Sequence, residues 1–167
     1  APASDQAYDA ARTARCRIMS AGLFMPSGVV EREQMMATIR LTMAQALVAA
    51  MAAQRTVIEG QTLPLFAGVW AIFGHGNVAG LGEALYGARD RLPTLRAHNE
   101  QAMAHAAIAF AKASRRRRMM AVTSSIGPGA TNMVTGAAVA HVNRLPVLLL
   151  PGDIFAGRRP DPVLQQI

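Results

Sequence analysis

The sequence predicts an α/β fold in which a parallel sheet carries helices on both faces. Short apolar runs rich in Val, Leu and Ile alternate with helical patterns along the chain. The runs do not alternate apolar with polar residues, which is typical of strands buried on both faces. Each run leads into a turn and then a helix, the order that gives right-handed βαβ units. Because ligands bind beyond the carboxyl ends of such strands, the turns are the candidate site segments.

The first predicted helix begins after Thr42. Apolar residues follow at the three-and-four spacing of an amphipathic helix, and Thr42 is a suitable N-cap. The residues at this spacing are Met43, Ala46, Leu47, Ala50 and Met51.

The rest of the chain is predicted as strand, turn and helix, repeated. The predicted strands are 69–73, 92–97, 119–123 and 146–150, and the predicted helices are 80–88, 100–113 and 130–141. Glycine-rich or polar turns are predicted at 74–77, 98–99 and 124–129. Since parallel strands end at one edge, we expect 74–80, 98–101 and 123–132 to lie together.

The length and composition indicate one domain. A chain of 167 residues, 51% hydrophobic and 16% charged, suits a single packed body. Residues 1–36 lack periodicity and contain a Met25–Gly28 turn, so we expect an N-terminal extension, which we interpret as upstream or vector-derived sequence, before a domain at 37–167. The end at Ile167, just after a strand and loop, predicts truncation of a longer chain.

The net charge of +7 raises nucleic-acid binding as an alternative. The one basic run, 115–118, follows a predicted helix, where cations meet the negative end of the helix dipole, so a solvated helix end is favoured over a nucleic-acid patch.

A single cysteine, Cys16, excludes an internal disulfide. No apolar stretch approaches the roughly 20 residues of a membrane span, and with no signal-peptide pattern the expected location is cytoplasmic.

Among the few acidic residues, Glu100 stands apart. It opens an apolar helix directly after a predicted strand. From position alone it is either a charge partner of the helix N-terminus or a catalytic carboxylate. The acidic residues after Thr38 are Glu59, Glu83, Asp90, Glu100, Asp153 and Asp161.

Two segments resemble the pyrimidine-binding domain of thiamine-diphosphate enzymes: 96–112 (RAHNEQAMAHAAIAFAK) and 127–136 (GPGATNMVTG). The resemblance implies that Glu100 hydrogen-bonds a ring nitrogen of the cofactor's aminopyrimidine and so activates the thiazolium carbon. Because desolvation favours a protonated carboxyl group, we expect this position to be buried. Thr123, Gly127, Pro128 and Gly129 are expected to border the pyrimidine ring, glycine allowing close backbone approach and proline fixing the loop.

Further segments, at 69–80, 141–153 and 161–166, look like the trihydroxycyclohexane-dione hydrolase branch of these enzymes, and the similarity extends from about Thr38 to the end. Ser125-Ile126 and Asn99 depart from the wider superfamily and fit this branch. The resemblance implies hydrolysis of a carbon-carbon bond in a cyclic 1,2-dione during myo-inositol catabolism. His75 is either a substrate contact and proton carrier or a structural turn residue. Gln101 either contacts substrate or cofactor or helps to cap its helix.

The same resemblance implies that this chain supplies half of an active site. In these enzymes a second domain with a Gly-Asp-Gly segment holds the diphosphate and Mg²⁺, and no such segment occurs here. We therefore expect a homodimer or homotetramer in the full-length protein, an inactive isolated chain, and no metal on this chain, with His98 and His105 in local hydrogen bonds. The alternatives are an acetolactate-synthase-like lyase fragment and a non-catalytic binding module.

Overall fold

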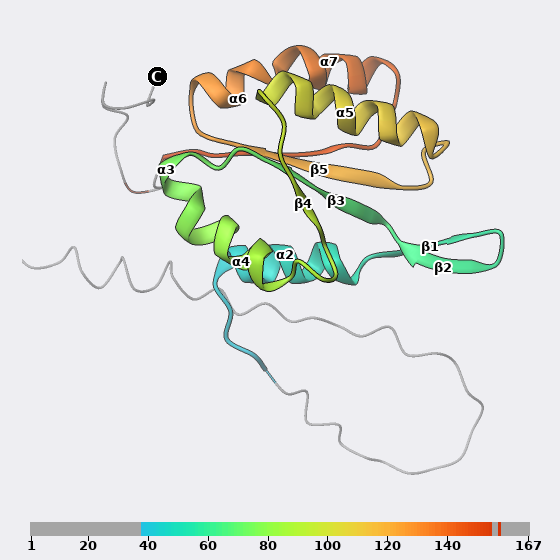
Figure 1. The fold of residues 1–167 in the computed structure, drawn as a ribbon, viewed down its shortest axis with the longest axis horizontal. Coiled ribbons are helices and arrows are strands. Elements are labelled where there is room, and N and C mark those ends of the chain that lie inside the picture. Colours follow the sequence, from blue (N-terminus) through green and yellow to red (C-terminus); the bar gives the residue numbers. More distant parts are fainter. Residues whose placement is uncertain (1–37, 155–156, 158–167) are drawn as a thin grey trace, which may run out of the picture.

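The computed structural model describes residues 38–154 and 157, which form a parallel sheet between two helical layers (Figure 1). The strand order is β4-β3-β5-β6, and every neighbouring pair is parallel. Helices α5, α6 and α7 lie over one face, and α2 and α4 lie over the other. The predicted α/β class is therefore confirmed. The segments 1–36 and 161–166 lie outside the described residues. The strands are β3 (Phe66–Ala71), β4 (Thr94–Leu95), β5 (Met119–Ser124) and β6 (Leu148–Pro151).

The first helix, α2 (Met43–Ala53), begins as predicted after Thr42. The Thr42 hydroxyl accepts from the Gln45 amide at 3.2 Å, and the Gln45 side chain accepts from the Thr42 amide at 3.0 Å. This reciprocal capping box satisfies two backbone donors that the first turn leaves free.

An antiparallel hairpin that the sequence did not predict follows α2. It consists of β1 (Arg55–Ile58) and β2 (Gln61–Pro64), with Ile58 paired to Gln61. The two loop residues, Glu59 and Gly60, have φ values of 52° and 80°. Positive φ at both positions is the requirement of a tight type I′ hairpin, and glycine meets it at one of them.

The segment after β3 differs from its prediction. The turn predicted at 74–77 is wrong, because α3 (Gly74–Asn77) is helical and continues through a π-helical turn, η1 (Val78–Gly82), into α4 (Glu83–Gly87). The strand itself begins at Phe66 rather than 69. A Cβ at Gly68 would lie 2.8 Å from the Pro93 carbonyl oxygen, so glycine is needed where β4 approaches, although it weakens the strand pattern in the sequence.

The second half of the chain follows its prediction more closely. Helix α5 (Glu100–Ala113) has its predicted bounds. The single helix predicted at 130–141 is instead two, α6 (Pro128–Asn132) and α7 (Val134–Val142), separated at Met133. Only two residues of the strand predicted at 92–97 pair with β3. No helix within the described part of the chain is long and apolar enough to cross a membrane.

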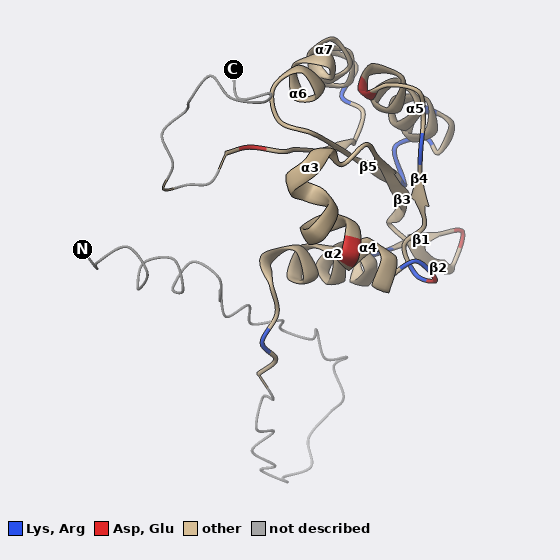
Figure 2. Ribbon diagram, turned by 60° about the vertical axis from the view of Figure 1, so that its left-hand side comes forward, with Lys and Arg blue, Asp and Glu red and all other residues tan. Residues whose placement is uncertain are grey.

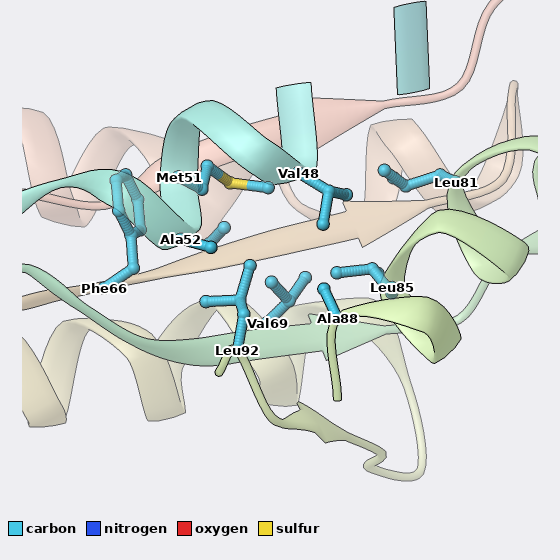
Figure 3. Close-up of a cluster of buried hydrophobic side chains, with 10 residues drawn as sticks. Val48, Met51, Ala52, Phe66, Val69, Leu81, Leu85, Ala88 and Leu92 are labelled. Atoms are coloured by element: carbon cyan, nitrogen blue, oxygen red, sulfur yellow. The ribbon is translucent and has the colours of Figure 1, made fainter. Parts of the chain in front are cut away.

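Two hydrophobic clusters hold the layers together, one on each face of the sheet. The first packs α2, η1 and α4 against β3 and β5 (Figure 3). The second packs Met103 and Ala107 of α5 against Met120 and Val122 of β5. Full burial of one large apolar side chain stabilises a fold by about 1.5–3 kcal/mol. These clusters therefore fix the carboxyl ends of the strands, and the first residue of α5, relative to one another. The first cluster contains Val48, Met51, Ala52, Phe66, Val69, Leu81, Leu85, Ala88, Leu92 and Ala121.

Candidate active site

The carboxyl ends of β3, β5 and β6 are tied together by close contacts and hydrogen bonds. A Cβ at Gly74, just after β3, would lie 2.5 Å from the Ser125 Cβ, just after β5. The Ser124 carbonyl oxygen accepts from the Asn77 side chain at 3.1 Å and from the Gly152 amide at 3.0 Å. The site segments predicted from the sequence therefore do meet at one edge of the sheet.

Glu100 lies at this edge, in the first turn of α5. The preceding residue, Asn99, caps the helix by accepting from the Ala102 amide at 2.8 Å. The helix dipole favours a carboxylate at this position. Glu100 Oε2 accepts a hydrogen bond from Asn132 Nδ2 at 3.1 Å. In this chain the Glu100 side chain is half-buried rather than buried.

The loop that leads into α6 forms the floor beside Glu100. Gly127 has a φ of 68°, and Pro128 occupies the first turn of the helix, where the missing amide hydrogen costs nothing. A Cβ on Gly129 would lie 2.9 Å from Glu100 Oε1 and closer still to Ser125 Oγ. Only glycine at this position leaves the Oε1 side of the carboxylate open.

An open hollow of about 510 Å³ lies over this floor. Three residues predicted from the sequence line it: Glu100, Pro128 and Gly129. Ser125, Thr131 and Asn132 also line it, and the sequence reasoning gave them no role. The available signal was position, because Thr131 and Asn132 belong to the glycine-rich motif and Ser125 lies just before it.

The other predicted site residues lie around the hollow without lining it. Thr123 is fully buried, and its hydroxyl donates to the Leu150 carbonyl oxygen at 2.9 Å, which ties β5 to β6. Gly127 is the N-cap residue of α6. His75 in α3 and Gln101 in α5 are both exposed.

The charge around the hollow is low. Figure 2 shows that acidic positions are few and scattered along the ribbon. Within the part of the chain that the structure describes, no three His, Cys, Asp or Glu side chains come together as metal ligands. The hydrogen-bond donor to the Glu100 carboxylate is a neutral amide, that of Asn132.

The model of the family described as "Thiamine pyrophosphate enzyme, N-terminal TPP binding domain" matches residues 67–167. The chain belongs to this family. Thiamine pyrophosphate, or TPP, is the same compound as thiamine diphosphate. The matched residues include every residue that lines the hollow.

Curated relatives resemble this chain closely. A protein from Geobacillus thermodenitrificans, named 3D-(3,5/4)-trihydroxycyclohexane-1,2-dione hydrolase, is 58% identical over 132 residues, which are 79% of this chain and 21% of the relative. Proteins with this name from Bacillus cereus and Clostridium tetani are each 54% identical over 79% of the chain and 20% of the relative. The chain thus spans about a fifth of the length of the relatives that it matches.

The geometry of the hollow fits the pyrimidine half of TPP. A flat ring needs a floor without side chains, and Gly129 supplies one directly beside Glu100 Oε1. A ring nitrogen that carries or receives a proton needs an oxygen that is not fully engaged. Oε2 accepts from Asn132, whereas the structure gives Oε1 no hydrogen-bond donor within the described residues.

Proposed function

We propose that this chain is the pyrimidine-binding, N-terminal part of a TPP-dependent hydrolase. In this proposal the full-length protein opens the ring of trihydroxycyclohexane-1,2-dione by carbon-carbon bond hydrolysis, in myo-inositol catabolism. The observation that carries the proposal is the position of Glu100, at the start of α5 with Oε1 over the bare backbone of Gly129. The 58% identity to a relative named for this reaction supports the choice of substrate.

The chain's own residues would hold and orient the pyrimidine ring. When bound, TPP supplies a nucleophilic carbon and an electron sink. Glu100 Oε1 would share a proton with a ring nitrogen, and the helix N-terminus would stabilise the carboxylate whenever that proton is on the ring. Gly127, Pro128 and Gly129 would place their backbone against the ring, while Thr123 would keep β5 and β6 in register behind it.

Two exposed residues are proposed to act on the substrate. His75 follows Gly74, where an added Cβ would lie 2.5 Å from the Ser125 Cβ at the edge of the hollow, and an imidazole suits proton transfer near neutral pH. Gln101 is adjacent to Glu100 and is exposed on the first turn of α5. Both would need the closed site of the complete enzyme to reach the substrate.

The remaining parts of the proposal concern the assembly. A second domain, contributed by another subunit of a homodimer or homotetramer, would bind the diphosphate group and Mg²⁺. Exposed Val134 and Val142 on α7 supply apolar surface that subunit contacts would cover. We also propose a cytoplasmic location for the full-length enzyme.

The test is ring-opening of the trihydroxy-dione by this chain and by its full-length parent, each with TPP and Mg²⁺. We expect activity in the parent alone, and Glu100→Gln in the parent should abolish it. Pyruvate is the comparison substrate. Turnover of pyruvate without the dione would instead indicate an acetolactate-synthase-like lyase, and turnover of neither would indicate a non-catalytic module.

A further inference from the structure

One hydrogen bond links the proposed cofactor-activating carboxylate to a different helix. Asn132 Nδ2 at the end of α6 donates to Glu100 Oε2 at the start of α5, at 3.1 Å. The two residues are 32 positions apart in the sequence. The bond therefore depends on how α6 packs against α5, and it is not a local feature of either helix.

This bond gives the two carboxylate oxygens different roles. Oε2 accepts from Asn132, while Oε1 lies 2.9 Å from the point that a Cβ on Gly129 would occupy. A glutamate side chain has three rotatable bonds, and its terminal torsion is broad, so nothing within the residue selects one oxygen for the hollow. The Asn132 amide makes that selection, because its donor fixes the plane of the carboxylate.

Asn132 is itself held by a short, well-determined turn. Gly127 and Pro128 set the start of α6, and the Thr131 hydroxyl donates to their carbonyl oxygens at 3.2 and 3.0 Å. The following residue, Met133, is 2% exposed and packs in the second hydrophobic cluster. The backbone on both sides of Asn132 is therefore anchored, which suits a residue that must hold a partner within a fraction of an ångström.

We propose that Asn132 is a positioning residue for Glu100, which directs Oε1 toward the pyrimidine ring; this inference rests on the proposed function. A neutral amide serves this purpose better than a cation would. A lysine or arginine would hold the carboxylate as an ion pair and oppose proton sharing with the ring, whereas an amide orients it without adding charge. Asn132 acts through Glu100 and has no contact with reacting atoms in this proposal.

The test uses the full-length parent with TPP and Mg²⁺ but no substrate. The first readout is the rate at which the thiazolium C2 proton exchanges with deuterated solvent, and the second is the dissociation constant of TPP. Asn132→Leu keeps the approximate size of the side chain and removes the donor without adding charge, and Asn132→Ala removes both. Asn143→Ala is the matched control, since it deletes a hydrogen bond from a side-chain amide to the Val139 carbonyl oxygen, at the other end of α7.

We expect both Asn132 variants to slow C2 exchange by about 10- to 100-fold, the cost of a misplaced catalytic group, while TPP affinity changes by less than about threefold. The Asn143→Ala variant should exchange like the wild type. In crystals of the TPP-free Asn132→Leu protein, the Glu100 side chain should leave its wild-type rotamer.

Wild-type exchange in both Asn132 variants, with exchange lost in Glu100→Gln, would overturn the positioning role and leave the proposed function standing. Unchanged exchange in Glu100→Gln would overturn both. An equal loss of C2 exchange and of TPP affinity in the Asn132 variants would also overturn the positioning role, because that pattern indicates a collapsed site rather than a misdirected carboxylate.

Discussion

At Gly129 the missing side chain decides how close a ligand can come to Glu100. A Cβ there would enter the space between Glu100 Oε1 and Ser125 Oγ, and the Asn132 amide holds the Glu100 carboxylate through its other oxygen. Shifting such groups costs about 1–3 kcal/mol in a packed environment. The smallest possible substitution at this position therefore reports on the proposed binding mode.

We predict that Gly129→Ala weakens TPP binding to the full-length protein by about 5- to 150-fold, the range that corresponds to this cost. Isothermal titration calorimetry measures it. Gly87→Ala at the end of α4 is the control, because a Cβ there meets nothing within 4 Å. If Gly129→Ala binds TPP as tightly as Gly87→Ala does, the ring does not lie over Gly129.

Single residues differ in how far the sequence reveals them. Glu100 could be singled out, because it alone among the few acidic residues opens an apolar helix after a predicted strand, but its proposed role came from the resemblance of 96–112 and 127–136 to thiamine-diphosphate enzymes. Asn132 could not be given its role, since its bond to Glu100 depends on a packing distance between two helices. The Glu100 side chain was expected to be buried but is half-buried, because the hollow above it is open in this chain.

At the scale of elements, local signals predicted helices better than strands. Helix α5 carries an N-cap, an acidic first turn and Lys112 in its last turn, so its bounds could be read directly. The break between α6 and α7 falls at Met133, where neither glycine nor proline marks the end of a helix, so the sequence did not predict it. The β1–β2 hairpin was missed because its strands have four residues each and are half exposed, so they bury no continuous apolar face.

The capping box of α2 yields a local stability prediction. Replacing Thr42 by Ala removes the acceptor of the Gln45 amide and should cost about 1 kcal/mol. Amides in the first turn of α2 should then exchange with solvent about fivefold faster, as measured by hydrogen exchange. Thr38→Ala, at an exposed residue before the cap, should leave those rates unchanged. Equal acceleration by both variants would show that the cap does not hold this end of α2.

Helices α5 and α7 approach closely through small residues. A Cβ at Gly136 would lie 2.6 Å from the Ala104 Cβ, so Gly136→Val should force the helices apart at a cost of about 1–3 kcal/mol. Hydrogen exchange should accelerate along α7. Ala138→Val places the same side chain on the exposed side of α7 and is the control. Unaltered exchange in Gly136→Val would mean that α7 can move away without loss.

At the scale of the whole molecule, the net charge of +7 raises the question of what the arginines of the 115–118 run do. Three arginines of the 115–118 run contact the chain itself. Arg116 donates to the carbonyl oxygens of Asn143 and Arg144 at 3.1 and 3.2 Å, and Arg118 donates to Pro64 O at 2.9 Å. Arg117 lies 3.8 Å from Glu59, the one ion pair within residues 38–154. The run therefore joins the ends of α5 and α7 to the hairpin region, and the preference for a helix end over a nucleic-acid patch stays a prediction.

This arrangement predicts weak, salt-sensitive binding to nucleic acid. It also predicts that Arg116→Gln and Arg115→Gln change the free energy of unfolding by different amounts. At 150 mM salt the chain should bind a 20-base-pair duplex more weakly than about 10⁻⁵ M by fluorescence anisotropy, within the range of non-specific binding. Arg116→Gln should lower the free energy of unfolding by about 1 kcal/mol, because it removes two bonds to carbonyl oxygens. Arg115→Gln should leave that free energy nearly unchanged. A phosphate-binding patch would behave differently, since both substitutions would then weaken duplex binding alike and leave stability intact.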